Sequence, residues 1–75
     1  MKEFTYEIEK MFGTVSNAGA LPLELNLISY NGVAARYDLR KWRVKDRQRT
    51  MQKGLTMTRQ ELLDLREFLN GLEDI

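Results

Sequence analysis

The residues best suited to binding chemistry lie between positions 36 and 59, where arginines and lysines surround the single tryptophan, Trp42. This segment carries nine basic residues against two acidic ones, a net charge of +7. The rest of the chain carries three basic residues against nine acidic ones, a net charge of −6. Such a basic segment favours a polyanionic ligand, although a solvated basic strand and loop would have the same composition.

Catalytic and metal-binding residue types are scarce in this sequence. Histidine and cysteine are both absent from its 75 residues. The chain therefore lacks the commonest acid–base group, the thiolate nucleophile, the thiolate zinc ligand and the disulfide. It also has no phosphate-binding glycine motif and no paired acidic motif, so no nucleophile–base arrangement is found. We expect a protein that is not an enzyme and that uses no metal, no cofactor and no small-molecule substrate.

Alternating apolar and polar residues predict four strands, over residues 4–15, 23–30, 33–44 and 51–57. The alternation slips near Lys10, and Gly13 indicates a bulge or bend in the first strand. Asn31-Gly32 predicts a tight hairpin turn between the second and third strands. Residues 45–50 are predicted to form a charged loop, in which Arg47 and Arg49 would be solvated.

A helix is predicted after the last strand. Thr58 followed by Glu61 is a capping box, and Gly71 marks the end of the helix. Its apolar positions recur at helical spacing: Leu62, Leu65, Phe68, Leu69 and Leu72. The sequence predicts one domain over residues 1–75 with an α+β fold, a four-stranded antiparallel curved β-sheet followed by one C-terminal α-helix. The helix should cover the leucine face of the sheet, made of Leu23, Leu25, Leu27, Tyr37 and Leu39.

Strand alternation then places Tyr30, Arg36, Arg40 and Trp42 together on the opposite face. Flat rings among cations are what binding of single-stranded nucleic acid requires, because bases stack on the rings and phosphates pair with the cations. Other roles stay open at this point. Trp42 could pack in a dimer interface, and the two arginines could neutralise acidic residues across the sheet.

The stretch "YDLRKW", a short charged loop and then "KGLTMTRQELLDLREFL" resemble the transcriptional positive-coactivator-four family. The sequence is most similar to its small bacterial branch, the YdbC-type proteins, in which the second strand ends much like "LNLISYN" here. The resemblance implies a homodimer whose curved sheets form grooves for single-stranded DNA. The sequence also departs from the family in three ways. The "NGVAA" loop lacks lysines, Ile28 replaces an arginine, and the serine-rich regulatory tail is missing.

By position, the resemblance assigns binding roles to Arg40 and Lys53, and places Tyr30 and Trp42 near aromatic contacts of the family. The complete predicted nucleic-acid-binding set is Tyr30, Arg36, Arg40, Trp42, Arg43 and Lys53. The predicted function is binding of single-stranded DNA, with RNA as a further ligand, at low sequence specificity, in transcription regulation, replication or repair. The alternative is a protein-interaction module whose basic segment docks an acidic partner.

Two further expectations follow from size and hydropathy. A domain this small usually needs a staple, and without cysteine the remaining staple is a second copy, so we expect a homodimer. No apolar segment resembles a signal peptide or approaches the roughly 20 residues of a membrane span. We therefore expect a cytoplasmic protein with no membrane partner, associated with the nucleoid if it is bacterial.

Overall fold

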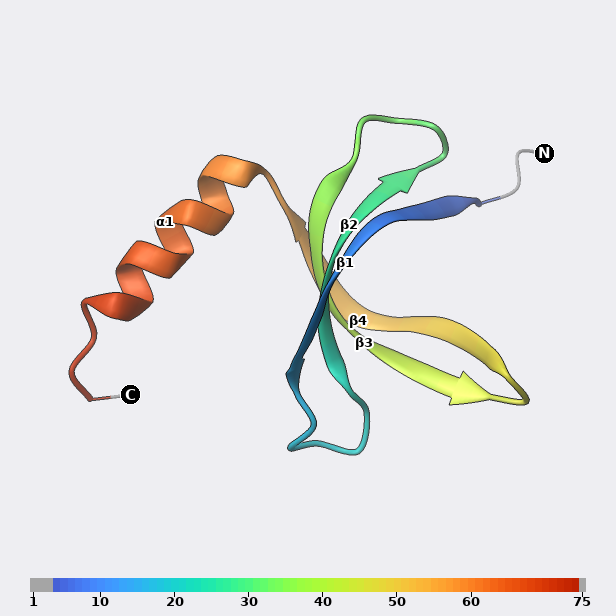
Figure 1. The fold of residues 1–75 in the computed structure, drawn as a ribbon, viewed down its shortest axis with the longest axis horizontal. Helices are drawn as coiled ribbons and strands as arrows, with labels where there is room; N and C mark the ends of the chain where they lie inside the picture. Colours follow the sequence, from blue (N-terminus) through green and yellow to red (C-terminus); the bar gives the residue numbers. More distant parts are fainter. Residues whose placement is uncertain (1–3, 75) are drawn as a thin grey trace.

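The computed structural model describes residues 4–74. The elements are β1 (Tyr6–Ser16), β2 (Leu23–Tyr30), β3 (Arg36–Lys45), β4 (Gln48–Met57) and α1 (Arg59–Asn70). The strands form one antiparallel sheet in the order β1-β2-β3-β4, so each strand pairs with its neighbour in the sequence (Figure 1). The predicted order of four antiparallel strands followed by a helix is confirmed.

The turn between β2 and β3 uses the predicted asparagine–glycine pair. Asn31 and Gly32 both have positive φ, 50° and 76°, a conformation that these two residue types tolerate best. Asn31 Oδ1 also accepts a hydrogen bond from the Thr5 backbone nitrogen at 2.8 Å, which ties this turn to the start of β1. The third strand begins at Arg36 rather than at Val33, so the connection is longer than predicted.

The turn between β3 and β4 is shorter than predicted. Its two residues, Asp46 and Arg47, have φ angles of 53° and 65°, as two-residue hairpin turns with a left-handed backbone require. Residues 48–50 therefore belong to β4, and the prediction of a loop over 45–50 is wrong. The usual signal of such a turn is a glycine in its second position, which this sequence replaces with Arg47.

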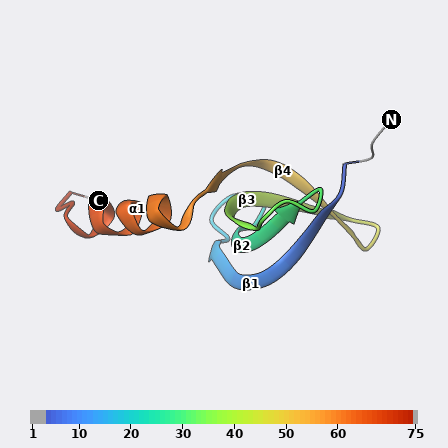
Figure 2. The same cartoon turned by 90° about the horizontal axis from the view of Figure 1, so that it is seen from above.

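The sheet is strongly curved, and bulges account for its curvature. Pairing between β1 and β2 shifts register after Ile8, Met11 and Thr14, and Gly13 has a φ of 138°. Pairing between β3 and β4 shifts once, between Arg40 and Trp42. Each extra residue bends its strand and increases the local twist, so the sheet coils (Figure 2). The irregularity predicted in the first strand is confirmed.

The curvature determines which face is buried. Asn26, Ile28, Asp38 and Trp42 are completely buried, and all four have the strand parity of Arg40. We call this side the inner face. The leucine face on the other side (Leu23, Leu25, Leu27, Tyr37 and Leu39) stays half-buried. The grouping of residues by face was predicted correctly, but the expectation that the leucine face forms the core is wrong, because the coiled sheet encloses its inner face.

The helix begins as predicted. The Thr58 side chain accepts from the Glu61 backbone nitrogen at 3.1 Å, and the Glu61 carboxylate accepts from the Thr58 nitrogen at 2.9 Å. Only Thr58 separates β4 from α1, so the chain has no loop in which to turn back over the sheet. The helix consequently projects beyond the sheet (Figure 2) and has no buried residue. The expectation that it covers the leucine face is wrong for the single chain.

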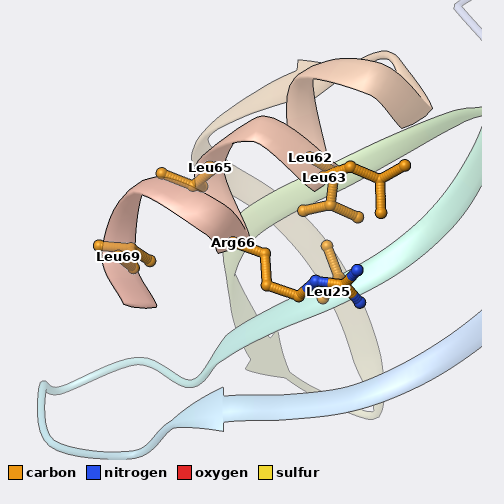
Figure 3. Close-up of a pocket in the computed structure, with 6 residues that line it drawn as sticks. All are labelled: Leu25, Leu62, Leu63, Leu65, Arg66 and Leu69. Carbon is orange, nitrogen blue, oxygen red and sulfur yellow. The ribbon is translucent and has the colours of Figure 1, made fainter. Parts of the chain in front are cut away.

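Where the helix approaches the sheet, the two leave an open apolar groove of about 370 Å³. Its lining consists of leucines and one arginine: Leu25, Leu62, Leu63, Leu65, Arg66 and Leu69 (Figure 3). Beyond the groove, the Phe68 side chain is 64% exposed and that of Leu69 is 42% exposed. The helix thus presents its apolar stripe largely to solvent.

Candidate nucleic-acid interface

An aromatic cluster from β1, β2, β3 and the residues before β1 lies on the inner face. The Phe4 ring centroid lies 5.8 Å from that of Tyr30 and 6.2 Å from that of Tyr6, and the Tyr6 centroid lies 6.0 Å from that of Trp42. Exposure falls across the cluster, from 64% for Phe4 through 37% for Tyr6 to 0% for Trp42. The rings accessible to a base are therefore those of Phe4 and Tyr6. Their alternation was visible in the sequence, but the pairing of Tyr6 with Tyr30 was not.

Trp42 is covered on one ring face by the Arg49 guanidinium, whose central carbon lies 4.5 Å from the ring centroid. Arg49 is in turn ion-paired with the Glu24 carboxylate. The indole Nε1 is buried and has no acceptor among residues 4–74. The expectation that Trp42 stands open as a stacking platform is therefore wrong for the single chain. Arg49 was missed because it was assigned to a loop.

Arg40 is held by a network inside the inner face. Its Nε and Nη2 donate to the Asp38 carboxylate at 2.7 and 2.8 Å, and its Nη1 donates to the Gln52 carbonyl at 3.0 Å. The arginine side chain is 15% exposed, and Asp38 is fully buried. These hydrogen bonds to Asp38 raise the pKa of the Arg40 guanidinium. Arg40 therefore neutralises an acid, as one interpretation of the sequence held, but the acid lies two residues earlier on its own strand and not across the sheet. The contact of Arg40 with phosphate stays a prediction.

Tyr30 completes this network. Its hydroxyl donates to the second Asp38 oxygen at 2.5 Å. Burial, together with this hydrogen bond and the nearby carboxylate charge, raises the pKa of Tyr30 to about 12. The tyrosine ring is half-buried and packs against Phe4, so it forms the more buried side of the aromatic cluster next to Phe4.

Gly54 makes room for the network. An ideal Cβ at this position would lie 1.9 Å from the Arg40 Cβ and 2.6 Å from the Leu39 carbonyl oxygen. Glycine is thus required by close approach of two strands at the bulge of β4. This is the physical reason for the glycine that follows Lys53 in the sequence.

The remaining predicted cations are exposed but do not share one surface. Arg36 pairs with Ile28 across β2 and β3, so it lies on the inner face, opposite a residue that is two positions before Tyr30 on β2. Arg43 has the opposite parity and lies on the outer face of β3. Lys53 is exposed at the bulge of β4. The extra residue of the bulge interrupts the alternation of the strand, so Lys53 need not lie on the same face as Leu55. The inner face therefore unites Tyr30, Arg36, Arg40 and Trp42, while Arg43 and Lys53 stand apart.

Comparison with known proteins places the chain in one family with a protein of Treponema pallidum. No protein-family model matches the sequence. It is 42% identical over 71 residues to an uncharacterized protein of Treponema pallidum (strain Nichols), an alignment that covers 93% of this chain and 81% of that protein. The chain therefore belongs to the same family as the Treponema protein. Membership of the positive-coactivator-four family stays a prediction. Within residues 4–74, no helix is long and apolar enough to cross a membrane.

Proposed function

We propose that this protein binds single-stranded nucleic acid, DNA first and RNA as a second ligand, with little sequence preference. One observation carries the proposal, the accessible Phe4 and Tyr6 rings on the same sheet face as the exposed cation Arg36. Rings accept every base because every base has a π-face, and cations neutralise the phosphates. The activity is binding without catalysis, and the cytoplasmic location stays a prediction.

The charge distribution supports the same proposal. The basic segment over residues 36–59 carries +7 against −6 on the remaining residues, and most of its cations are exposed. Arg36, Arg43 and Lys53 lack the acidic partners that Arg40 and Arg49 have among residues 4–74. A polyanion therefore finds cations that need not first break an ion pair.

Titration of a labelled dT oligonucleotide, a matched RNA strand and a duplex by fluorescence anisotropy tests the proposal. Each phosphate contact should contribute roughly −0.7 to the slope of log K against log salt for a single strand. Arg36→Glu should weaken binding and flatten that slope, whereas Gln60→Glu on the helix adds a negative charge away from the site. Equal affinity for all three ligands, or no binding at moderate salt, would contradict the proposal.

We also propose that the protein is a homodimer joined through α1 and the leucine face. The radius of gyration is 14.0 Å, against about 11 Å for a compact chain of this length, because the helix projects. Phe68, Leu69 and Leu55 are 64%, 42% and 53% exposed, and the leucine-lined groove lies between helix and sheet. A second helix of the same kind supplies the apolar partner that this surface lacks.

Sedimentation tests the dimer directly. The wild type should sediment at twice the 8.8 kDa of one chain, and Phe68→Asp should shift it toward the monomer. Asn70→Asp adds the same charge at the end of the helix without removing an apolar group and should remain dimeric. A wild type that stays monomeric at micromolar concentration would refute this part of the proposal without touching the binding assay.

The alternative function is docking of an acidic protein. The outer face of β3 favours it, because Lys41, Arg43 and Lys45 alternate along the strand and are all exposed. Charge reversal at Lys45, an outer-face cation outside the predicted nucleic-acid-binding set, would then abolish capture of an acidic peptide and leave oligonucleotide binding by the inner face intact. A substitution on the outer face therefore tests docking of an acidic protein, and a substitution on the inner face tests oligonucleotide binding.

A further inference from the structure

The only tryptophan of the chain is hidden beneath a side chain that is itself open to solvent. Trp42 is 0% exposed, while the Arg49 side chain that lies over its ring is 33% exposed. Tyr6 closes the neighbouring side of the ring at a tilted angle of 53°. Movement of one long side chain would therefore expose a face of the largest aromatic ring on the inner face.

Arg49 is held in this position by Glu24. The ion pair joins Arg49 Nη2 to the Glu24 carboxylate, whose side chain is 13% exposed, and the two residues come from β4 and β2. A planar guanidinium stacks on an aromatic ring in the same way as a nucleic-acid base does. Arg49 and Glu24 thus occupy the two positions, above a ring and beside a cation, that a base and its phosphate would need.

We infer that Arg49 and Glu24 form an autoinhibitory contact that masks a stacking site on Trp42, and that a single strand displaces it. This inference rests on the proposed function. A base takes the place of the guanidinium on the ring, and a phosphate replaces the Glu24 carboxylate as the partner of Arg49. The buried indole Nε1, which has no acceptor among residues 4–74, then becomes able to donate a hydrogen bond.

Glu24→Gln removes the anchor of the mask and keeps the size of the side chain. Its affinity for a labelled dT oligonucleotide should rise by about two- to fivefold, the range expected from losing a partly exposed ion pair that competes with the ligand. Glu7→Gln removes the same charge from an exposed position on β1 and should change affinity less than Glu24→Gln does. Comparing the two separates unmasking from the general loss of negative charge.

Trp42 fluorescence gives a second measurement. Acrylamide should quench the free wild type poorly, and Glu24→Gln and Arg49→Lys should both be quenched more strongly, because lysine keeps the charge but lacks the planar group. The dT oligonucleotide should quench wild-type emission to saturation at the binding stoichiometry. Circular dichroism checks that each variant is folded. If Glu24→Gln does not fold, Arg49→Lys still tests the inference.

The outcomes distinguish this inference from the proposed function. If the wild type shows no anisotropy change with the oligonucleotide, the proposed function fails and the inference fails with it. If the wild type binds but its Trp42 emission is unchanged, and Glu24→Gln gains no more affinity than Glu7→Gln, binding stands and the masking contact is rejected. Weaker binding by Glu24→Gln would also reject it, because the pair would then support the site.

Discussion

Truncation of Trp42 is the sharpest test of where the core of this protein lies. The indole is fully buried on the inner face, beside the Tyr6 ring and beneath Arg49. Replacing a buried tryptophan by alanine typically costs about 3–5 kcal/mol. The Arg49 contact adds to the loss by roughly 0.5–2 kcal/mol. The Nε1 that has no acceptor reduces it, since burying an unpaired donor itself costs about 1–3 kcal/mol. These opposing contributions roughly cancel, so the expected loss stays near 3–5 kcal/mol.

A chain of 75 residues has a total unfolding free energy of roughly 4–11 kcal/mol. Trp42→Ala should therefore lower the melting temperature by roughly 12–40 °C or abolish the cooperative transition. Thermal and urea unfolding followed by circular dichroism measure this, at one fixed protein concentration because association contributes to stability. Val44→Ala is the matched control, since Val44 is two residues further along β3, faces the same side and is 63% exposed. If both variants melt together, the inner face is not the core and the reasoning is wrong.

Three further predictions concern single side chains. Gly54→Ala should destabilise by about 1–3 kcal/mol in urea, because its Cβ overlaps Arg40, whereas Gly19→Ala, with its nearest atom at 3.7 Å, should stay near wild type. In an alkaline ultraviolet titration, Tyr30 should ionise near its raised pKa of about 12 rather than at 10.0. The stability that the Tyr30 hydroxyl contributes is then fully present below pH 10.0 and is lost as pH rises through about 12. Tyr30→Phe should remove this loss of stability, and a single tyrosinate step at pH 10.0 would disprove the prediction. Thr58→Ala should lower the unfolding free energy by about 1 kcal/mol in thermal melts, and an unchanged melt would mean that the capping box adds nothing.

Local patterns were enough to predict the elements and the grouping of residues by face. Alternation has a period of two whatever the shape of the sheet, so Arg40 and Trp42 had to share a side of β3, and the register of β2 against β3 adds Tyr30 to that side. The capping box at Thr58 likewise depends on a few neighbouring residues, and it was found where predicted. These properties depend on short segments, so they can be predicted from the sequence.

Which face is buried depends on the shape of the whole sheet, and this could not be predicted. The leucines looked like the better core because they are more apolar than Asn26 and Asp38, which are nevertheless fully buried. Asp38 is buried because Arg40 and Tyr30 supply its hydrogen bonds, a compensation that arises only once the strands are paired. The register shifts that curve the sheet involve long-range pairing, of which Gly13 was the single local sign.

The site was predicted in part for a similar reason. Arg49 was placed in a loop because Asp46-Arg47 lacks the glycine of a recognisable two-residue turn, and a loop residue has no defined face. Once the turn is shortened, Arg49 pairs with Val44 in the β3–β4 ladder and comes over the ring of Trp42. A turn of two residues in place of the predicted loop of six thus changed a solvated charge into a contact at the centre of the candidate site.

The positions of the unpaired cations connect the two halves of the proposed function. Arg40 and Arg49 are engaged by acidic side chains within the chain, so under the proposed function the first phosphate contacts come from exposed cations, and Arg36, Arg43 and Lys53 are the predicted ones. These three do not face the same way, since Arg36 lies on the inner face and Arg43 on the outer face of one sheet. A single strand that uses both must therefore cross the edge of the sheet or contact two copies of the chain. The proposed dimer satisfies the second condition, because joining two chains through α1 and the leucine face leaves the inner face of each sheet free to contribute cations to one ligand.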